Sequence, residues 1–438
     1  MSLYRFLKPF ATGATAALLA VGLFTACKTS DYLAVTSPSR IPASGLEDPA
    51  NAALLVNGAV ADFECAYGSY VVASGLISDE LDDATQTAAR YPYDQRTLLS
   101  SSTTYQSADC VGIGTYSPLQ TARVSADNAR RLLIGWTDEQ VANRQTLLAT
   151  VAAYEGYAEL LLGEGFCGTT FSTFNPDGTV LYGTAITPAQ AFDSAITRFG
   201  EAITAATAVG TGATNILDMA YVGRARAKLD KGDLTGARAD AALVPASFVL
   251  NMTASAIASR RYNRVWADNG SSGAAFNQAS SVGASYRTLN DPRVPVTHPN
   301  VPNSTTGVPI WVQQKYTTSA SPVPIATGVE AQLIVAEADI ASGNTAEATT
   351  ILNTSRAAGG ETALPGGTSA AGLKTALIEE RRRALFLQGT RLYDVIRFQL
   401  PLDPAPGAKF PGGGTYGSQL CMPLPDVERF NNPLLKGS

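Results

Sequence analysis

A short acidic stretch, SDELDD at residues 78–83, is the part of the sequence best equipped for acid–base chemistry. Most glycoside hydrolases use two carboxylates that flank the scissile bond, one as the acid and the other as a base or nucleophile. The side chains of Asp79, Glu80, Asp82 and Asp83 therefore keep a secreted glycosidase open as one function. Carboxylates can also accept hydrogen bonds from sugar hydroxyls, so Asp79 and Glu80 could instead orient a bound sugar.

Histidine occurs once, as His298 in the Pro-flanked segment VTHPN, where we predict a solvated loop residue. One histidine excludes histidine clusters for zinc and disfavours a Ser-His-Asp triad. No CxxC pair and no EF-hand pattern occurs, so we predict neither a metal nor a cofactor. The net charge of −5 and the pI of about 5.1 argue against a nucleic-acid binder, which needs a basic surface.

The segment at residues 378–398 mixes arginines and carboxylates with apolar residues at helical spacing. We expect a helix that ends at Gly389 and pairs Arg383 with Glu379 and Glu380, followed by a second short helix. The arginines are predicted to bridge helices through carboxylates and carbonyl oxygens. The residues expected to face inward are Leu377, Ala384, Leu385 and Leu387.

The N-terminus has the features of an export signal, with Arg5 and Lys8 before an uncharged run that ends in FTAC. We interpret residues 1–27 as a lipoprotein signal peptide that ends at a lipidated Cys27; the alternative is a plain membrane anchor. Residues 28–48, rich in Ser and Pro, are predicted to form an extended tether, and residues 49–438 a single domain.

Four further cysteines, Cys65, Cys110, Cys167 and Cys421, suit an exported protein with disulfides. They allow three pairings, between which the sequence does not choose. We favour Cys65–Cys110 and Cys167–Cys421, because the second pair would tie the C-terminal tail to the middle of the chain.

Helical periodicity predicts a mainly α fold, with small residues where paired helices touch. Two segments share one plan, in which a Gly-containing turn, KGDLTGA or SGNTAEA, joins two helices. These units resemble tetratricopeptide repeats, with unrelated helical hairpins as the alternative. Between them, residues 244–324 form a long irregular insertion, the kind of segment in which binding residues usually lie. The predicted helical regions are 49–67, two helices within 117–162, 187–206, 215–241 and 329–358.

Several segments resemble, in order along the chain, those of the SusD/RagB family of nutrient-binding outer-membrane lipoproteins. The strongest is EERRRALFLQGTRLYDVIRF, which resembles the C-terminal signature of that family. The others are FTAC, which ends in Cys27, SDELDD, VAAYEGYAELLLGEGF, LNDPRV, VEAQLIVAEADI and CMPLPDVERFNNPLL.

The resemblance implies tetratricopeptide-like helix pairs that form a superhelical frame, with the irregular insertion as the ligand-binding part. It implies a lipid-anchored protein at the outer membrane, exposed on the cell surface. It further implies capture of oligosaccharides, or sometimes peptides, for import through a partner TonB-dependent β-barrel transporter, without catalysis.

Aromatic rings and planar polar groups are the side chains that bind sugars, because rings cover C–H faces and polar groups take the hydroxyls. We expect the loop around residues 79–96 and the insertion to converge on one shallow site; the alternative is that each aromatic packs its own loop. Asp291 and Arg293 are expected to fix the insertion to the frame. The candidate ligand-binding residues are Asp79, Glu80, Tyr93, Asp94, Arg96, Trp266, Tyr286, Trp311 and Tyr316.

Two other functions remain open at this point. A glycosidase would need a facing pair of carboxylates in an aromatic cleft. A protein-interaction scaffold of the cell envelope would need a smooth concave helical groove.

Overall fold

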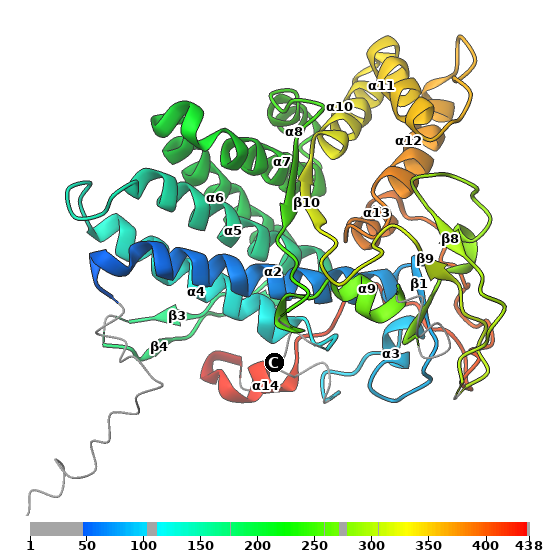
Figure 1. Ribbon diagram of the computed structural model, residues 1–438, viewed down its shortest axis with the longest axis horizontal. Helices are drawn as coiled ribbons and strands as arrows, with labels where there is room; N and C mark the ends of the chain where they lie inside the picture. Colours follow the sequence, from blue (N-terminus) through cyan, green and yellow to red (C-terminus); the bar gives the residue numbers. More distant parts are fainter. Residues whose placement is uncertain are drawn as a thin grey trace, which may run out of the picture. The chain divides into compact units, whose positions relative to one another are not determined.

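Helix α2 (Ala52–Ile77) is the element against which much of the chain packs (Figure 1). Every residue from Phe63 to Ile77 is buried, as expected of a helix that is apolar on all sides. We predicted that this helix ends near Tyr67, which is wrong. The small and apolar residues that follow Tyr67 pack against other segments throughout, and no proline interrupts them.

The computed structural model describes residues 47–102, 112–175, 177–257, 259–270, 278–304 and 306–435. Residues from Pro49 to the C-terminus form one compact unit. None of the described helices is long and apolar enough to cross a membrane. The predicted lipidation site Cys27 and most of the predicted tether lie outside the described residues, as does Cys110.

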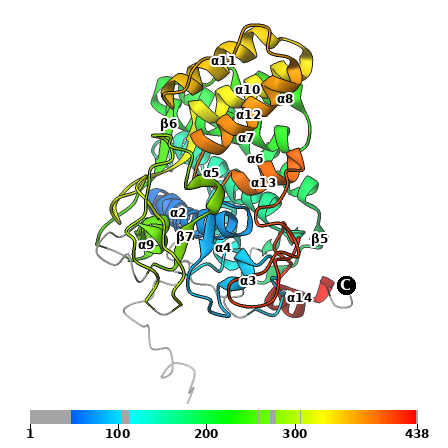
Figure 2. The same ribbon diagram turned by 90° about the vertical axis from the view of Figure 1, so that its right-hand side faces the viewer.

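Consecutive helices pack side by side, so the predicted mainly helical fold is confirmed (Figures 1 and 2). Thr187 caps α6 with a capping box, and Gly232 and Gly343 take positive φ in the two predicted turns. Helix α10 packs on α8 although the insertion separates them in sequence. The main helices are α4 (Tyr116–Gly135), α5 (Arg144–Gly165), α6 (Pro188–Val209), α7 (Thr214–Asp230), α8 (Leu234–Ala241), α10 (Gly328–Ser342), α11 (Thr345–Ala358), α12 (Ala370–Ala384) and α13 (Arg391–Phe398).

Small residues allow these helices to approach one another closely. A Cβ atom added at Gly223 of α7 would lie 2.3 Å from Cζ of Phe199 on α6. One added at Gly163 of α5 would lie 2.5 Å from Cε1 of Phe192. The phenyl rings of α6 therefore occupy the space that glycine leaves on the facing helices.

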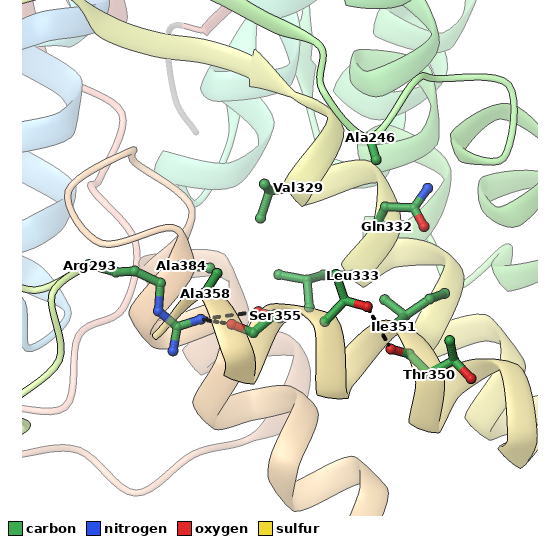
Figure 3. Close-up of a pocket in the computed structure, with 11 residues that line it drawn as sticks. Ala246, Arg293, Val329, Gln332, Leu333, Thr350, Ile351, Ser355, Ala358 and Ala384 are labelled. Atoms are coloured by element: carbon green, nitrogen blue, oxygen red, sulfur yellow. Dashed lines mark hydrogen bonds between the residues drawn. The ribbon is translucent and has the colours of Figure 1, made fainter. Parts of the chain in front are cut away.

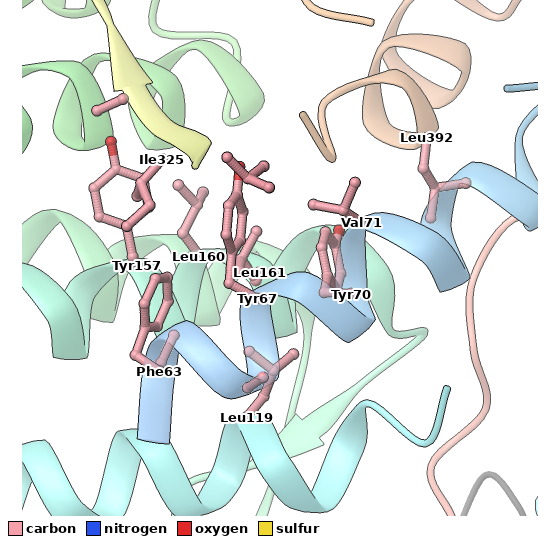
Figure 4. Close-up of a cluster of buried hydrophobic side chains, with 14 of the residues drawn as sticks. Phe63, Tyr67, Tyr70, Val71, Leu119, Tyr157, Leu160, Leu161, Ile325 and Leu392 are labelled. Carbon is pink, nitrogen blue, oxygen red and sulfur yellow. The ribbon is translucent and has the colours of Figure 1, made fainter. Parts of the chain in front are cut away.

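The core next to α2 is rich in aromatic rings (Figure 4). Phe63 packs edge-to-face on Tyr154, and Tyr157 packs edge-to-face on Phe199. The hydroxyl of Tyr67 lies 2.6 Å from the carbonyl oxygen of Pro324 and 2.9 Å from that of Gln388. The first long helix is thus joined directly to segments more than 250 residues later in the chain.

The segment between α8 and α10 is built from short strands, turns and short helices (Figure 2). Across the whole described chain, each sheet consists of two antiparallel strands. The pairs are β1 (Leu81–Asp83) with β7 (Ser280–Val282), β6 (Val249–Met252) with β10 (Val323–Thr327), β8 (Val296–Thr297) with β9 (Val312–Gln313), β2 (Thr169–Thr170) with β5 (Ala185–Ile186), and β3 (Thr173–Phe174) with β4 (Val180–Leu181). The short helices are α3 (Tyr91–Asp94), α9 (Arg264–Asn269) and α14 (Asp426–Asn431).

The arginines near the C-terminus bridge elements, as predicted. Arg381 of α12 binds Asp394 of α13 at 2.8 Å, and Arg397 of α13 binds Glu337 of α10 at 2.6 Å. Arg382 donates to the carbonyl oxygen of Ser285 in the insertion.

Two details of this segment differ from the prediction. Helix α12 ends at Ala384 and not at Gly389. Glu380 pairs with Arg293 at 2.7 Å and not with Arg383, because its carboxylate points to the insertion. Arg293 also donates to the carbonyl oxygen of Ser355, at 2.9 Å, so it fixes the insertion to the frame as predicted.

The predicted disulfide between Cys167 and Cys421 is confirmed, with the two Cα atoms 5.0 Å apart. Backbone hydrogen bonds flank it, from Cys167 to Met422 (2.9 Å) and from Met422 to Gly165 (2.8 Å). Cys65 is also disulfide-bonded, and its predicted partner Cys110 lies outside the described residues.

Candidate functional site

The first long loop and the insertion meet, as the sequence predicts for a shared site. Strand β1 pairs with β7, with Leu81 opposite Val282. Arg90 binds Asp268 at 2.8 Å. These contacts place the acidic stretch at residues 78–83 beside the aromatic residues of the insertion.

Four side chains at this junction form what we call the Trp311 cluster: Asp82, Arg287, His298 and Trp311. The imidazole of His298 stacks on the indole of Trp311, with ring centroids 4.3 Å apart and planes at 11°. The guanidinium carbon of Arg287 lies 5.6 Å from the centre of the same indole. Arg287 Nη2 binds Asp82 at 2.5 Å. All four side chains are partly exposed, so the cluster forms part of the surface.

The backbone holds the polar members of the cluster in place. Arg287 Nε donates to the carbonyl oxygen of Val282, at 2.7 Å. His298 Nδ1 lies 2.9 Å from the carbonyl oxygen of Ile310, so Nδ1 carries the proton in that contact and Nε2 is left as the second polar atom. Burial raises the pKa of Asp82 to about 7, although the positive charge of Arg287 opposes this shift.

A polar pocket of about 440 Å³ adjoins Arg287. Arg287 Nη1 makes no hydrogen bond to the described residues, which leaves one donor pair for a ligand. Arg287 is the member of the Trp311 cluster that lines this hollow, and a guanidinium fork beside polar groups such as Asn290 can recognise hydroxyl-rich or amide-containing molecules. The pocket is lined by Arg287, Thr288, Asn290, Asp291, Pro292, Val294, Pro295 and Val296.

Three of the predicted aromatic platforms are buried. Tyr93 donates to the carbonyl oxygen of Ile113 (2.9 Å), and Tyr316 to that of Leu387 (3.0 Å). Tyr286 stacks on Phe386, with ring centroids 5.0 Å apart. Because each ring is at most 2% exposed, none of the three presents a face to a ligand. They instead hold the loops to the helical frame.

The four predicted polar contacts are also buried and paired within the protein. Asp79 forms a two-pronged ion pair with Arg391, at 2.8 Å for each contact. Glu80 accepts from the backbone N–H of Leu387 at 2.8 Å, and Asp94 accepts from that of Asp83 at 2.7 Å. Arg96 donates to the carbonyl oxygens of Gly417 and Pro404. Each of the four makes at least one bond within the protein, so they support the loops from beneath.

Two predicted residues, Trp266 and Trp311, are partly exposed. Trp266 lies in α9, where Tyr262 meets it edge-to-face at 6.5 Å. Trp311 belongs to the cluster described above. These two tryptophans are the predicted site residues that the structure leaves available to a ligand.

A second hollow, of about 510 Å³, lies between α10 and α11 (Figure 3). Its walls are mostly aliphatic, so it offers few of the polar groups that take sugar hydroxyls. Arg293 and Ser355 at one end are bonded to each other. We therefore centre the candidate ligand site on the Trp311 cluster. The hollow is lined by Ala246, Arg293, Val329, Gln332, Leu333, Thr350, Ile351, Thr354, Ser355, Ala358 and Ala384.

Comparison with known proteins supports the predicted resemblance. The model of the SusD family matches residues 313–420, from strand β9 through helix α13 and beyond. No curated protein matches the chain. The chain is SusD-like.

Solved structures extend the likeness to almost the whole chain. A SusD superfamily protein from Parabacteroides distasonis superposes with a TM-score of 0.67 at 12% identity, covering 90% of this chain and 98% of that one. One from Bacteroides vulgatus gives 0.65 at 13% identity, covering 88% and 98%. A SusD-like carbohydrate-binding protein from Bacteroides vulgatus gives 0.60 at 15% identity, covering 83% and 86%. At such identities the superpositions establish the SusD-like fold.

Three members of the cluster in this SusD-like chain, Asp82, Arg287 and His298, were not among the predicted ligand-binding residues. His298, predicted to be a solvated loop residue, is partly buried against Trp311. Arg287 meets Asp82 across 205 residues of sequence, and no local pattern distinguishes it from other loop arginines. The alternation of burial in β1, where Asp82 points outward between buried Leu81 and Asp83, is the one signal that favours Asp82.

The acidic stretch does not supply a facing pair of carboxylates. Asp79 is bound to Arg391, Glu80 is buried, and Asp83 contacts Arg90. Asp82 alone of the four is partly exposed. This arrangement argues against the glycosidase alternative in this SusD-like chain.

Proposed function

We propose that this protein is a cell-surface lipoprotein of the outer membrane that binds oligosaccharides or peptides. It would be anchored through lipid on Cys27 and would deliver its ligand to a partner TonB-dependent β-barrel transporter. The observation that carries the proposal is the convergence of two distant loops on the partly exposed cluster of Asp82, Arg287 and Trp311. The SusD-like fold and the carbohydrate-binding relative support it.

Ligand binding can be tested with two tryptophan variants, using glycan arrays and then calorimetry on any glycan that binds. Trp311→Ala removes the indole of the cluster and should weaken binding by at least about tenfold, or about 1.4 kcal/mol. Trp136→Ala is a matched control, because Trp136 is also partly buried but packs in a separate cluster at the start of α2. Equal affinities of the two folded variants would rule out the Trp311 cluster as the binding site.

Partnership can be tested on the native lipidated protein. A stoichiometric β-barrel transporter should copurify when the protein is extracted from outer membranes with detergent. Recovery of the protein alone, or with soluble periplasmic proteins, would contradict the delivery role.

A protein-interaction scaffold is the second candidate, and the hollow between α10 and α11 favours it. An aliphatic hollow on paired helices suits an apolar segment of another protein. The copurification experiment separates the two candidates, because a scaffold would retain its partners when Trp311 is replaced and would bind no glycan.

A further inference from the structure

Exposed apolar side chains gather on hairpin β3–β4 and on the C-terminal segment that contains α14. Seven of the fifteen exposed large apolar side chains of the described residues lie there. Phe430 is 71% exposed and Leu181 is 53% exposed. Exposed apolar side chains that gather in one place mark an interaction surface more often than an uncovered surface of a monomer. We call five of them the apolar platform: Phe174, Val180, Tyr182, Phe430 and Leu434.

The register of the hairpin directs its aromatic residues away from the protein. Phe174 is paired opposite Val180, and Thr173 opposite Leu181. Thr173 faces the body of the protein, since its hydroxyl donates to Asp127 of α4 at 2.6 Å. Because successive side chains of a strand point to opposite faces, Phe174 and Val180 face outward.

The two halves of the platform are fastened together. Asn432 donates to the carbonyl oxygen of Gly183 at 2.8 Å, and Thr170 donates to Glu428 at 2.6 Å. The Cys167–Cys421 disulfide joins the same two segments covalently. The hairpin and the C-terminal segment therefore present their apolar side chains as one rigid unit.

Hairpin β3–β4 lies near the end of α4 that adjoins the start of α2, and α14 lies further along below α4 (Figure 1). Arg131 of α4 donates to the carbonyl oxygen of Phe174 at 3.0 Å. On the same part of α4, Ala129 and Leu133 pack against Ala52 and Val56 of α2. The compact unit begins at Pro49, so the preceding chain joins it on this side.

The charges around the platform are paired or locally bonded. Arg131 binds Asp127 at 3.1 Å, and Arg429 binds Asp426 at 3.5 Å. Asp177 at the hairpin tip accepts hydrogen bonds from Thr179 of the same turn. Among the described residues, the basic groups beside the platform are paired with carboxylates, so contact with lipid would depend on apolar burial.

We propose that the apolar platform rests in the lipid surface of the membrane to which the chain is anchored, and so sets the orientation of the ligand site above it. The proposal rests on the proposed lipid anchor at Cys27. A tether of residues 28–48 spans at most roughly 70 Å when extended, so the platform stays within reach of that surface. Insertion of aromatic and aliphatic side chains adds a second membrane contact to the one made by the lipid on Cys27.

The test uses the full chain with Cys27→Ser, so that no lipid obscures the intrinsic affinity, and flotation with phosphatidylcholine vesicles. The parent should float, and Phe174→Ser with Phe430→Ser should lower its partition coefficient by at least about tenfold. Changing the salt from ~50 to ~500 mM should have little effect on the parent. The matched control is Leu243→Ser with Val249→Ser, which removes two apolar side chains of similar exposure elsewhere.

Three results would overturn the proposal: a parent that does not float, equal loss in the platform and control variants, or binding abolished by salt. It would also be wrong if the platform variant floated normally but lost copurification with a β-barrel transporter, because the platform would then contact protein. Equal thermal unfolding temperatures exclude misfolding. Glycan affinity is measured separately, so failure of ligand binding with intact flotation would count against the proposed function alone.

Discussion

Glu80 and Lys315 are two buried charged groups that hold the turn between α12 and α13. Glu80 accepts from the backbone N–H of Leu387 at 2.8 Å, and Lys315 donates to the carbonyl oxygen of Phe386 at 2.5 Å. Burial raises the pKa of Glu80 to about 7 and lowers the pKa of Lys315 to about 8. Neither residue presents its charge to a ligand, so their role is to fix the turn.

The raised pKa of Glu80 predicts a specific pH dependence of stability. The folded state binds the Glu80 proton more tightly than the unfolded chain does. The stability that this proton contributes is therefore complete below pH 4.5 and is lost as pH rises through about 7. One pKa unit corresponds to about 1.4 kcal/mol. Between pH 4.5 and 7 the free energy of unfolding of the parent should therefore fall by about 3 kcal/mol on account of Glu80, and that of Glu80→Gln should not.

Urea unfolding across this pH range measures the effect of Glu80→Gln. Glu379→Gln is the control, because Glu379 lies on α12, which leads into the same turn, and its side chain is 39% exposed. Parallel pH profiles of the parent and Glu80→Gln would contradict the prediction.

At the scale of single residues, the sequence identified types suited to sugar binding but not their exposure. Tyr93 and Tyr316 have the composition of platform residues, yet their hydroxyls reach carbonyl oxygens of Ile113 and Leu387. Whether a loop aromatic faces solvent depends on what other segments cover it. Trp311 remained exposed because its neighbours are strands at the edge of the insertion.

At the scale of elements, the contact of α6 with α7 depends on glycine. Gly223→Ala would place a methyl group 2.3 Å from the ring of Phe199, which must shift within a filled core. We expect a loss of about 1–3 kcal/mol in the free energy of unfolding, measured by chemical denaturation.

Gly58→Ala is the matched control for Gly223→Ala. Gly58 lies within α2 but has open space around an added Cβ atom. Because alanine favours a helix over glycine, this variant should gain about 0.5–1 kcal/mol. Equal effects of the two substitutions would show that the close approach at Phe199 is relieved without cost.

Helical pairs were predictable because their signals are local. The capping residue Thr187 and the turn glycines Gly232 and Gly343 stand where the helices begin or end. The length of α2 was not predictable in this way, since its second half is held by residues far along the chain. The pairing of β1 with β7 likewise joins three-residue segments that carry no pattern of their own.

At the scale of the whole molecule, the Cys167–Cys421 disulfide closes a loop of 254 residues. Replacing both cysteines with serine should lower the free energy of unfolding by about 2–5 kcal/mol, because the unfolded chain regains the freedom that the bond removed. Chemical denaturation under oxidising conditions measures this loss. An unchanged midpoint would show that the backbone hydrogen bonds around Met422 suffice to hold the segment.

Helix α2 has a consequence for the order in which the chain can become structured. Its partners include Gln388 for Tyr67, and the residues just after it bind Leu387 and Arg391. Contacts so distant in sequence slow folding, because a long loop must close before they contribute. A nascent chain that lacks its last 60 or so residues would leave α2 without these partners. The first long helix of the described residues is therefore among the last to reach its final environment, which suits the export that we propose for this chain.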